Sequence, residues 1–279
     1  MEITVVLFVL AVIQGIAEFL PVSSSGHLVL FENIEFFHTT IHAMGDGLLL
    51  YINVMLHVAT LVAIFIFLRK DLVKLVTGAL RALGARNFSD PDFRSAMYIV
   101  LASVPAGVIG VLLHDVIESL FSSPVIVFFM LILNGFILLS TKIITVKNRQ
   151  IEEMGMMRAL IIGLFQAIAI IPGISRSGMT ITGGFLLGVE PEQSARFSFL
   201  MAIPVILGAG LLESLKMLGK GVPSGFVLPM AGAVLVAIVV ALLSLKLLFV
   251  MVRRIRIDVF GYYTILVGAA GLAAVYFFS

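Results

Sequence analysis

The stretch QGIAEFLPVSSSGH, residues 14–27, decides the fold of this chain, because QAIAIIPGISRSGM at residues 166–179 repeats it 152 residues later. In both stretches a Gln is followed nine residues later by Ser-x-Ser-Gly, and a Pro interrupts the apolar sequence in between. Hydroxyl, carboxylate, imidazole and guanidinium groups are costly inside a bilayer unless they face one another or a polar cavity. The repeat therefore predicts one polar site built from two halves of the chain.

Composition places the chain in a membrane. Of its 279 residues, 61% are hydrophobic and only 12% are charged, whereas about a quarter of a soluble domain is charged. The apolar segments have the length of helices and lack the ten-residue alternation of a membrane barrel. The chain has no Cys, which excludes disulfides and thiol nucleophiles. The net charge of +2 comes from basic residues in short loops, so no nucleic acid partner is predicted.

The distribution of Lys and Arg predicts the topology. These residues concentrate in segments 69–94, 142–158 and 253–256, which we assign to the cytoplasmic side. Segment 31–47 and the short loop with His114, Asp115 and Glu118 contain neither Lys nor Arg, and we assign them to the outside. Six spanning helices then connect these segments, at about residues 48–68, 95–113, 124–141, 193–214, 224–249 and 258–278.

The two motif segments, about 3–30 and 159–189, do not fit simple spans. Residues 3–20 would form about 27 Å of helix before Pro21 and the serines end it, and the apolar remainder is too short to cross. We interpret both as re-entrant helical hairpins with the turn buried in protein. Three spans separate them, so the second half is inverted and the two turns meet near the midplane. The predicted fold is an all-α integral membrane protein, one polytopic domain over 1–279, with repeat halves of about 1–141 and 158–279.

Several residues of the first motif are candidates for chemistry. Gln14 and Glu18 are four residues apart and share a helix face. An intramembrane Glu indicates function, although Glu18 could instead be half of a structural ion pair. The hydroxyls of residues 23–25 could bind a ligand, and one of them could simply cap the next helix. His27 is the nearest titratable partner and could serve as acid or base. His57, near the start of a predicted span, is a further candidate.

Arg176 is the sharpest candidate of the second motif. It lies between Ser175 and Ser177, after the Pro172-Gly173 turn and before an apolar helix. Backbone amides at a helix N-terminus, hydroxyls and a forked guanidinium together form a phosphate cradle. The alternative is that Arg176 only neutralises Glu18, and both roles are compatible if the resting pair opens when substrate arrives.

Residues 14–27 closely resemble the first signature of the bacitracin-resistance type undecaprenyl-diphosphatases, and residues 172–180 resemble the second. Residues 195–204 and 53–69 are also similar, so the resemblance covers essentially the whole chain. It implies removal of one phosphate from undecaprenyl diphosphate, which recycles the lipid carrier of cell-wall synthesis and confers bacitracin resistance. It further implies a multi-pass protein of the inner (plasma) membrane, a site open to the outer face and a divalent cation, Mg or Ca.

By motif position, the resemblance assigns catalytic roles to Glu18, Ser24, His27 and Arg176, and metal binding to Glu18. Together the motifs predict substrate binding by Gln14, Ser23, Ser25, Gly26, Gly173, Ser175, Ser177, Gly178 and Thr180. Two positions depart from the family pattern. Gln14 stands where the family often has Glu, which removes one charge from a metal site, and His57 stands where many relatives have Gln.

The residues also fit the substrate class that the resemblance implies. A diphosphate on a long prenyl chain needs a polar pocket within the membrane and cationic support for charge on phosphate. Ser24 could attack phosphorus with Glu18 or His27 as base, or an activated water could attack directly. The rival function is a transporter or flippase of a lipid phosphate or small anion. Predicted partners are the prenyl diphosphate, membrane lipids and, indirectly through the shared substrate, bacitracin; a homo-oligomer is left open.

Overall fold

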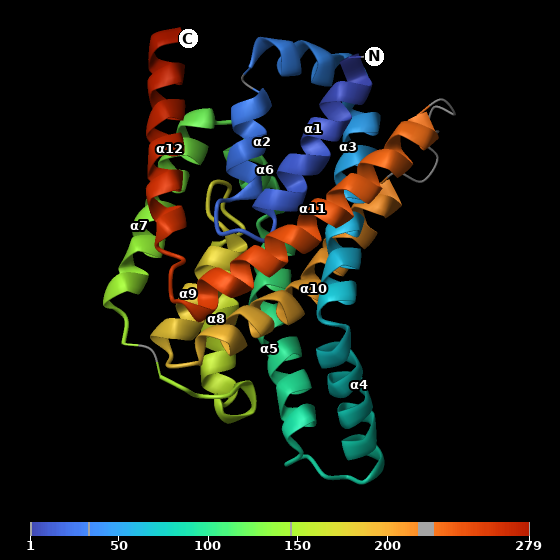
Figure 1. Ribbon diagram of the computed structural model, residues 1–279. Helices are drawn as coiled ribbons and strands as arrows, with labels where there is room; N and C mark the ends of the chain where they lie inside the picture. The colour runs from blue at the N-terminus through green and yellow to red at the C-terminus, as the bar shows by residue number, and fades with distance from the viewer. Residues whose placement is uncertain (1, 33, 146, 217–225, 279) are drawn as a thin grey trace.

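The computed structural model describes residues 2–32, 34–145, 147–216 and 226–278, and their regular structure is helical (Figure 1). The first half contains α1 (Glu2–Ala17), α2 (Ser24–Glu32), α3 (Glu35–Phe67), α4 (Arg69–Gly84), α5 (Pro91–Leu112), α6 (His114–Phe121) and α7 (Pro124–Ser140). Two short 3-10 helices follow, η1 (Thr141–Ile143) and η2 (Ile151–Glu153). The second half contains α8 (Met156–Ile168), α9 (Arg176–Leu186), α10 (Pro191–Lys216), α11 (Val227–Arg253) and α12 (Val259–Phe278).

Within the described residues, five helices are long and apolar enough to cross a membrane: Pro91–Leu112, Pro124–Ile143, Pro191–Leu215, Val227–Arg253 and Asp258–Phe277. They match five of the six predicted spans, and the predicted start of one of these at residue 224 lies outside the described residues. The sixth, predicted at 48–68, meets the criterion only as the pair Tyr51–Phe67 and Arg69–Gly84, which is bent by 77°. The chain is therefore a multi-pass membrane protein, and the part that the structure describes contains five or six spans.

The segments expected to be loops contain more helix than predicted. Residues assigned to an outer loop, 31–47, largely belong to α3, which begins at Glu35 and runs unbroken for 33 residues. Charged and polar residues mark where apolar sequence ends, but a helix continues until a breaker or a cap stops it, and no Pro lies in α3. For the same reason α4 and α6 occupy parts of the expected loops at 69–94 and after residue 113.

Both motif segments have the expected form of helix, break and helix. α1 ends at Ala17 and α2 begins at Ser24, while α8 ends at Ile168 and α9 begins at Arg176. The equivalent starts of α2 and α9 are again 152 residues apart. Pro21 and Pro172 fall within the breaks, where the amide that Pro lacks is not needed for a helical hydrogen bond.

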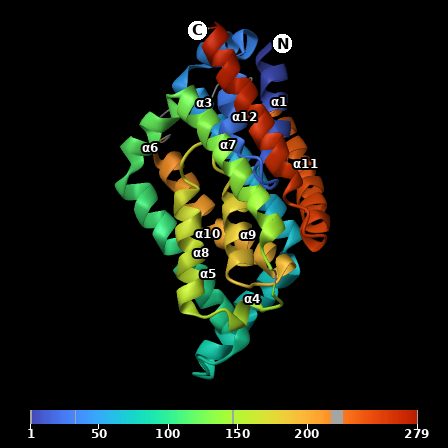
Figure 2. The same ribbon diagram turned by 90° about the vertical axis from the view of Figure 1, so that its left-hand side faces the viewer.

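The two halves of the chain are packed into each other. α1 packs against α11 of the second half, and α8 packs against α5 of the first half. α7 and α12 lie side by side along most of their length (Figure 2). The main core lies next to the first break and includes the edge-to-face pair Phe19 and Phe199, with ring centroids 5.5 Å apart. This packing holds the two breaks in fixed positions at the centre of the molecule.

Candidate active site

The breaks of the two motifs touch each other. Glu18 lies in the first break, and Arg176 begins α9 after the second. Nη2 of Arg176 donates a hydrogen bond of 2.6 Å to Oε1 of Glu18. The backbone amide of Gly173 donates to Oγ of Ser25 at 3.0 Å. The polar residues of the two motifs therefore form one site, although they are about 150 residues apart in sequence.

Asn134 of α7 ties the two breaks together. Its side-chain Nδ2 donates to the carbonyl of Pro21 at 3.2 Å, and its Oδ1 accepts from the amide of Ser175 at 2.9 Å. Asn134 is fully buried. Sequence reasoning did not select it, although an amide in the middle of an apolar span is the kind of residue that indicates a function within the membrane.

One serine in each motif caps the following helix. Oγ of Ser23 accepts from the amide of Gly26 at 3.2 Å, and Oγ of Ser175 accepts from the amide of Gly178 at 3.2 Å. These are N-caps, which supply an acceptor to an otherwise unpaired helix amide. The alternative structural role considered for one serine of residues 23–25 is thus what Ser23 performs.

The backbone at the site includes two residues in the left-handed region. Gly173 has a φ of 95°, and a Cβ there would lie 2.3 Å from the carbonyl oxygen of Val127, so only glycine fits. Ser23 has a φ of 68°, a conformation that costs a non-glycine residue about 1–3 kcal/mol. The surrounding packing holds this strained turn directly before Ser24.

A cavity of about 370 Å³ lies at the junction of the two breaks. The polar residues that line it come from both motifs and from α3 and α10. The lining residues are Gln14, Ala17, Glu18, Ser23, Ser24, Ser25, Leu28, Asn53, His57, Phe121, Ala169, Ile170, Ile174, Ser175, Arg176 and Glu213. This volume is within the range of sites that hold a small ligand.

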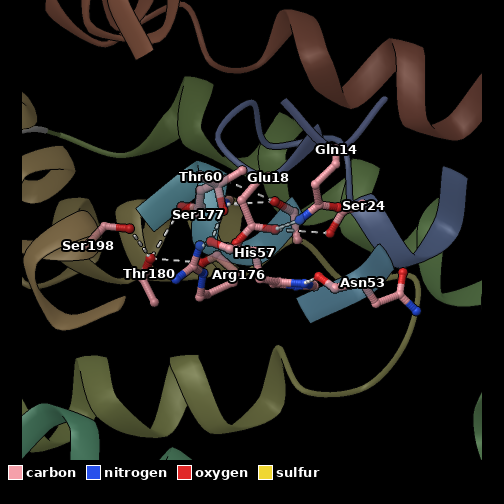
Figure 3. A network of polar contacts seen from close by, with 12 residues as sticks. Gln14, Glu18, Ser24, Asn53, His57, Thr60, Arg176, Ser177, Thr180 and Ser198 are labelled. Carbon is pink, nitrogen blue, oxygen red and sulfur yellow. Dashed lines mark hydrogen bonds and ion pairs between the residues drawn. The ribbon is translucent and has the colours of Figure 1, made fainter. Parts of the chain in front are cut away.

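Glu18 is the centre of the polar network (Figure 3). Its Oε2 accepts from Nε2 of Gln14 at 3.0 Å and from Oγ of Ser24 at 3.4 Å, while its Oε1 accepts from Arg176. The side chains of Glu18 and Arg176 are 8% and 17% exposed. Removing one partner would leave the other charge buried and unpaired, which is strongly destabilising.

One nitrogen of the Arg176 guanidinium is available for a further hydrogen bond. Its Nη1 is buried and has no hydrogen-bond partner among the described residues. An unpaired buried donor costs about 1–3 kcal/mol. Because this nitrogen is out of contact with solvent, the guanidinium has to turn toward the adjacent cavity before Nη1 can donate to an anion there.

The two candidate histidines lie in different surroundings. Both nitrogens of His27 are engaged, Nδ1 with the carbonyl of Ser23 at 2.8 Å and Nε2 with the hydroxyl of Tyr263 at 2.7 Å. The two rings are stacked, and His27 is not among the cavity-lining residues. His57 does line the cavity. Its Nδ1 lies 2.8 Å from the carbonyl of Asn53, which can only accept, so a neutral His57 carries its lone pair on Nε2.

Several predicted binding residues lie behind the cavity wall. Oγ1 of Thr180 donates to the carbonyl of Arg176 at 2.8 Å and pairs with Oγ of Ser198 at 2.6 Å, which fixes the start of α9. Ser177 pairs with Ser175 at 3.1 Å. Gly26, His27, Gly173, Ser177, Gly178 and Thr180 are absent from the lining of the cavity. In this structure they support the residues that line it, and their contacts with substrate stay predictions.

The cavity also contains two polar residues that the sequence interpretation did not assign. Asn53 comes from α3 and Glu213 from α10. Glu213 changes the chemistry of the cavity more than Asn53 does, because it adds a second carboxylate to the lining. Its signal in the sequence is a carboxylate near the end of an apolar span, which marks functional sites in membranes.

The oxygen atoms that line the cavity are of the chemical type that a hard divalent cation prefers. Carboxylates at Glu18 and Glu213 and amide oxygens at Gln14 and Asn53 line it, and Mg²⁺ and Ca²⁺ prefer oxygen ligands. Among the described residues, the only group of three acidic or His side chains within ligand spacing is the exposed His114, Asp115 and Glu118, outside this lining. Mg²⁺ needs only one or two carboxylates when substrate phosphates complete its coordination.

A bundle of apolar helices that encloses charged and hydroxyl groups at the breaks of two helices defines a polytopic membrane protein with a buried polar site. The chain belongs to the family described as Bacitracin resistance protein BacA, whose sequence profile matches residues 7–270.

Relatives of the chain share one name. The undecaprenyl-diphosphatase of Rubrobacter xylanophilus is 40% identical over 258 residues, which are 91% of this chain and 92% of that protein. The undecaprenyl-diphosphatase of Trichlorobacter lovleyi is 38% identical over 269 residues, 95% and 94% of the two chains. That of Methanobrevibacter smithii is 33% identical over 269 residues, 93% of each chain.

Proposed function

We propose that this protein is an undecaprenyl-diphosphatase, which hydrolyses undecaprenyl diphosphate to undecaprenyl phosphate and inorganic phosphate. The observation that carries the proposal is the cavity in which Arg176 and Ser24 both donate hydrogen bonds to the carboxylate of Glu18. Relatives that match nearly the full chain bear the same name. The activity recycles the lipid carrier for cell-wall synthesis, and bacitracin affects the protein only indirectly, through the shared substrate.

Substrate binding begins at Arg176. The unpaired Nη1 donates to an oxygen of the terminal phosphate, which makes the strong charge-assisted hydrogen bond typical of Arg and phosphate. As the guanidinium turns toward the phosphate, its hold on Glu18 weakens. The carboxylate, no longer neutralised, is then available as a base. The resting ion pair thus protects both charges until a diphosphate replaces it.

Ser24 is the proposed nucleophile. Its Oγ forms a bond to the terminal phosphorus as the bond from that phosphorus to the bridging oxygen breaks, and its proton passes to Glu18, 3.4 Å away. The lipid monophosphate leaves with the bridging oxygen. Water then cleaves the phosphoserine, which releases inorganic phosphate and restores the hydroxyl. Phosphoryl transfer depends chiefly on positioning and on neutralising phosphate charge, which Arg176 supplies.

A divalent cation, Mg or Ca, is part of the proposal. Glu18 and Glu213 would hold it, with the amide oxygens of Gln14 and Asn53 as further ligands. Bound there, it would neutralise negative charge on the diphosphate. Because Gln14 replaces a carboxylate frequent in the family, Glu213 is the residue in this cavity that can supply the second negative charge.

We further propose that α1–α2 and α8–α9 are re-entrant hairpins of an inverted repeat within a single membrane domain. The identical offset of the helix starts, the matching Ser caps and the reciprocal packing of α1 on α11 and α8 on α5 support this. The distribution of Lys and Arg supports a plasma-membrane orientation with the cavity open to the outer face. A second function compatible with the same site is transport of a lipid phosphate or small anion.

Phosphate release by the purified full-length protein in detergent tests the function. With undecaprenyl diphosphate and Mg²⁺ or Ca²⁺, the protein should release inorganic phosphate in proportion to enzyme concentration, and chelation should stop the release. A protein that only transports a lipid phosphate or anion would release none, and that result would overturn the proposal. Chelation that leaves the rate unchanged would remove the cation from it.

A further inference from the structure

A second cavity adjoins the polar one. It has a volume of about 190 Å³. Four polar or charged residues line both cavities: Glu18, His57, Arg176 and Glu213. Its remaining wall is one stretch of α10, formed by Val205, Ile206, Ala209 and Gly210. The cavity is therefore polar where it meets the site and apolar along α10.

The spacing of these residues defines a groove along one helix face. Ile206, Ala209 and Gly210 follow the spacing of three and four residues that places side chains on the same side of a helix. Leu207 and Leu211 point elsewhere and are 50% and 62% exposed. Ala209 lines the groove and is itself exposed, so the groove reaches the surface of the molecule.

We propose that this groove binds the first part of the prenyl chain, next to the diphosphate. The inference rests on the proposed function. A diphosphate held at Arg176 must send its chain out of the polar cavity, because apolar surface is unfavourable in water and among charges. The groove offers an apolar exit that directly adjoins Glu18 and Arg176. It is smaller than the roughly 300–1,000 Å³ of pockets that enclose a whole ligand, so the rest of the chain lies in lipid beside Leu207 and Leu211.

Gly210 sets the width of the groove. A Cβ built at Gly210 meets no atom within 4 Å, so a larger side chain has room to enter the space that the prenyl chain would occupy. Gly208 is a matched control in the same helix turn. A Cβ there also meets no atom within 4 Å, but Gly208 is not part of the groove. Both glycines lie inside α10, where a larger residue favours the helix more than glycine does.

The test compares a diphosphate that has a prenyl chain with one that has only a methyl group. Phosphate release is measured with farnesyl diphosphate and with methyl diphosphate, which is too short to fill the groove, for the wild type, Gly210→Phe and Gly208→Phe. We expect Gly210→Phe to lower the ratio of kcat/KM for farnesyl over methyl diphosphate about tenfold, the effect of losing about two buried methylene groups. Gly208→Phe should keep the wild-type ratio. Gly210→Leu is a milder variant that gives the same direction if the phenylalanine disturbs folding.

The outcomes separate this inference from the function on which it rests. A wild type that releases no phosphate from any diphosphate contradicts the function itself. An active wild type whose ratio stays within twofold in Gly210→Phe and Gly210→Leu contradicts the groove alone. An equal fall of the ratio in the Gly208 and Gly210 variants would also contradict the groove. It would show that a large side chain anywhere on this part of α10 has the effect.

Discussion

Ser24 and Arg176 are equivalent residues of the two motifs, and both hydrogen-bond to Glu18. Each is the first residue of its helix, α2 or α9, and each directly follows a capping serine. Oγ of Ser24 lies 3.4 Å from Oε2, and Nη2 of Arg176 lies 2.6 Å from Oε1. Helix N-termini carry partial positive charge and favour anions. The repeat therefore places the proposed nucleophile and the proposed phosphate ligand at two helix ends that meet at one carboxylate.

Replacing Arg176 by Lys should reduce turnover while leaving the fold intact. Lysine keeps the charge but loses the planar fork, with which Arg176 pairs with Glu18 at rest and with a phosphate when substrate is bound. We expect kcat/KM for undecaprenyl diphosphate to fall on the order of a hundredfold, the effect of losing one donor to developing charge. Arg158→Lys is the control, because Arg158 donates to the carbonyl of Met154 and does not line the cavity. Wild-type kinetics in Arg176→Lys would show that Arg176 does not hold the phosphate.

Substitution of Ser24 distinguishes the two possible routes of hydrolysis, attack by the serine oxygen and attack by water. If its oxygen attacks phosphorus, Ser24→Ala should abolish measurable turnover, and acid quenching of the wild type should trap a phosphoserine at residue 24 that mass spectrometry detects. Ser95→Ala, which removes a hydroxyl bonded to the carbonyl of Pro91 on α5, should stay active. Substantial turnover in Ser24→Ala, with no trapped phosphoserine, would assign the attack to water instead.

The pairing of the motifs could be predicted because its signal is local. Pro21 and Pro172 mark the breaks, and the cost of burying Glu18 and Arg176 unpaired requires that they meet. The contacts of Asn134 and Tyr263 could not be predicted in the same way. Each depends on how α7 or α12 packs against a distant motif, and a single polar residue in an apolar helix does not reveal its partner.

The same limit explains the histidines and the helix boundaries. The closeness of His27 to Glu18 in sequence predicts a catalytic role, whereas in the structure its ring contacts Tyr263 of α12, and the role stays a prediction. His57 is far from both motifs in sequence, but the packing of α3 brings it to the cavity. Charge patterns located the spans well, whereas the continuation of α3 back to Glu35 depends on the absence of a helix breaker rather than on hydropathy.

The two histidines should respond differently to substitution. His57→Ala should lower kcat/KM at least about tenfold, because the cavity loses a hydrogen-bonding group beside charged phosphate. Tyr263→Phe removes only the hydroxyl that holds His27, so it should lower the unfolding free energy by about 1 kcal/mol. Its kcat at a temperature where both proteins are folded should stay within about threefold of the wild type. A much larger change in kcat would show that His27 acts in the site.

The proposed orientation can be tested with single cysteines, since the chain has none of its own. Ser119 lies on α6 and Arg86 follows α4, and both are exposed. The Lys and Arg distribution places the first outside and the second in the cytoplasm. In intact cells, Ser119→Cys should therefore react with a membrane-impermeant thiol reagent, and Arg86→Cys should react only after the membrane is opened. Asp46→Cys should behave like Ser119→Cys. The opposite labelling pattern would reverse the orientation and place the mouth of the cavity on the cytoplasmic side.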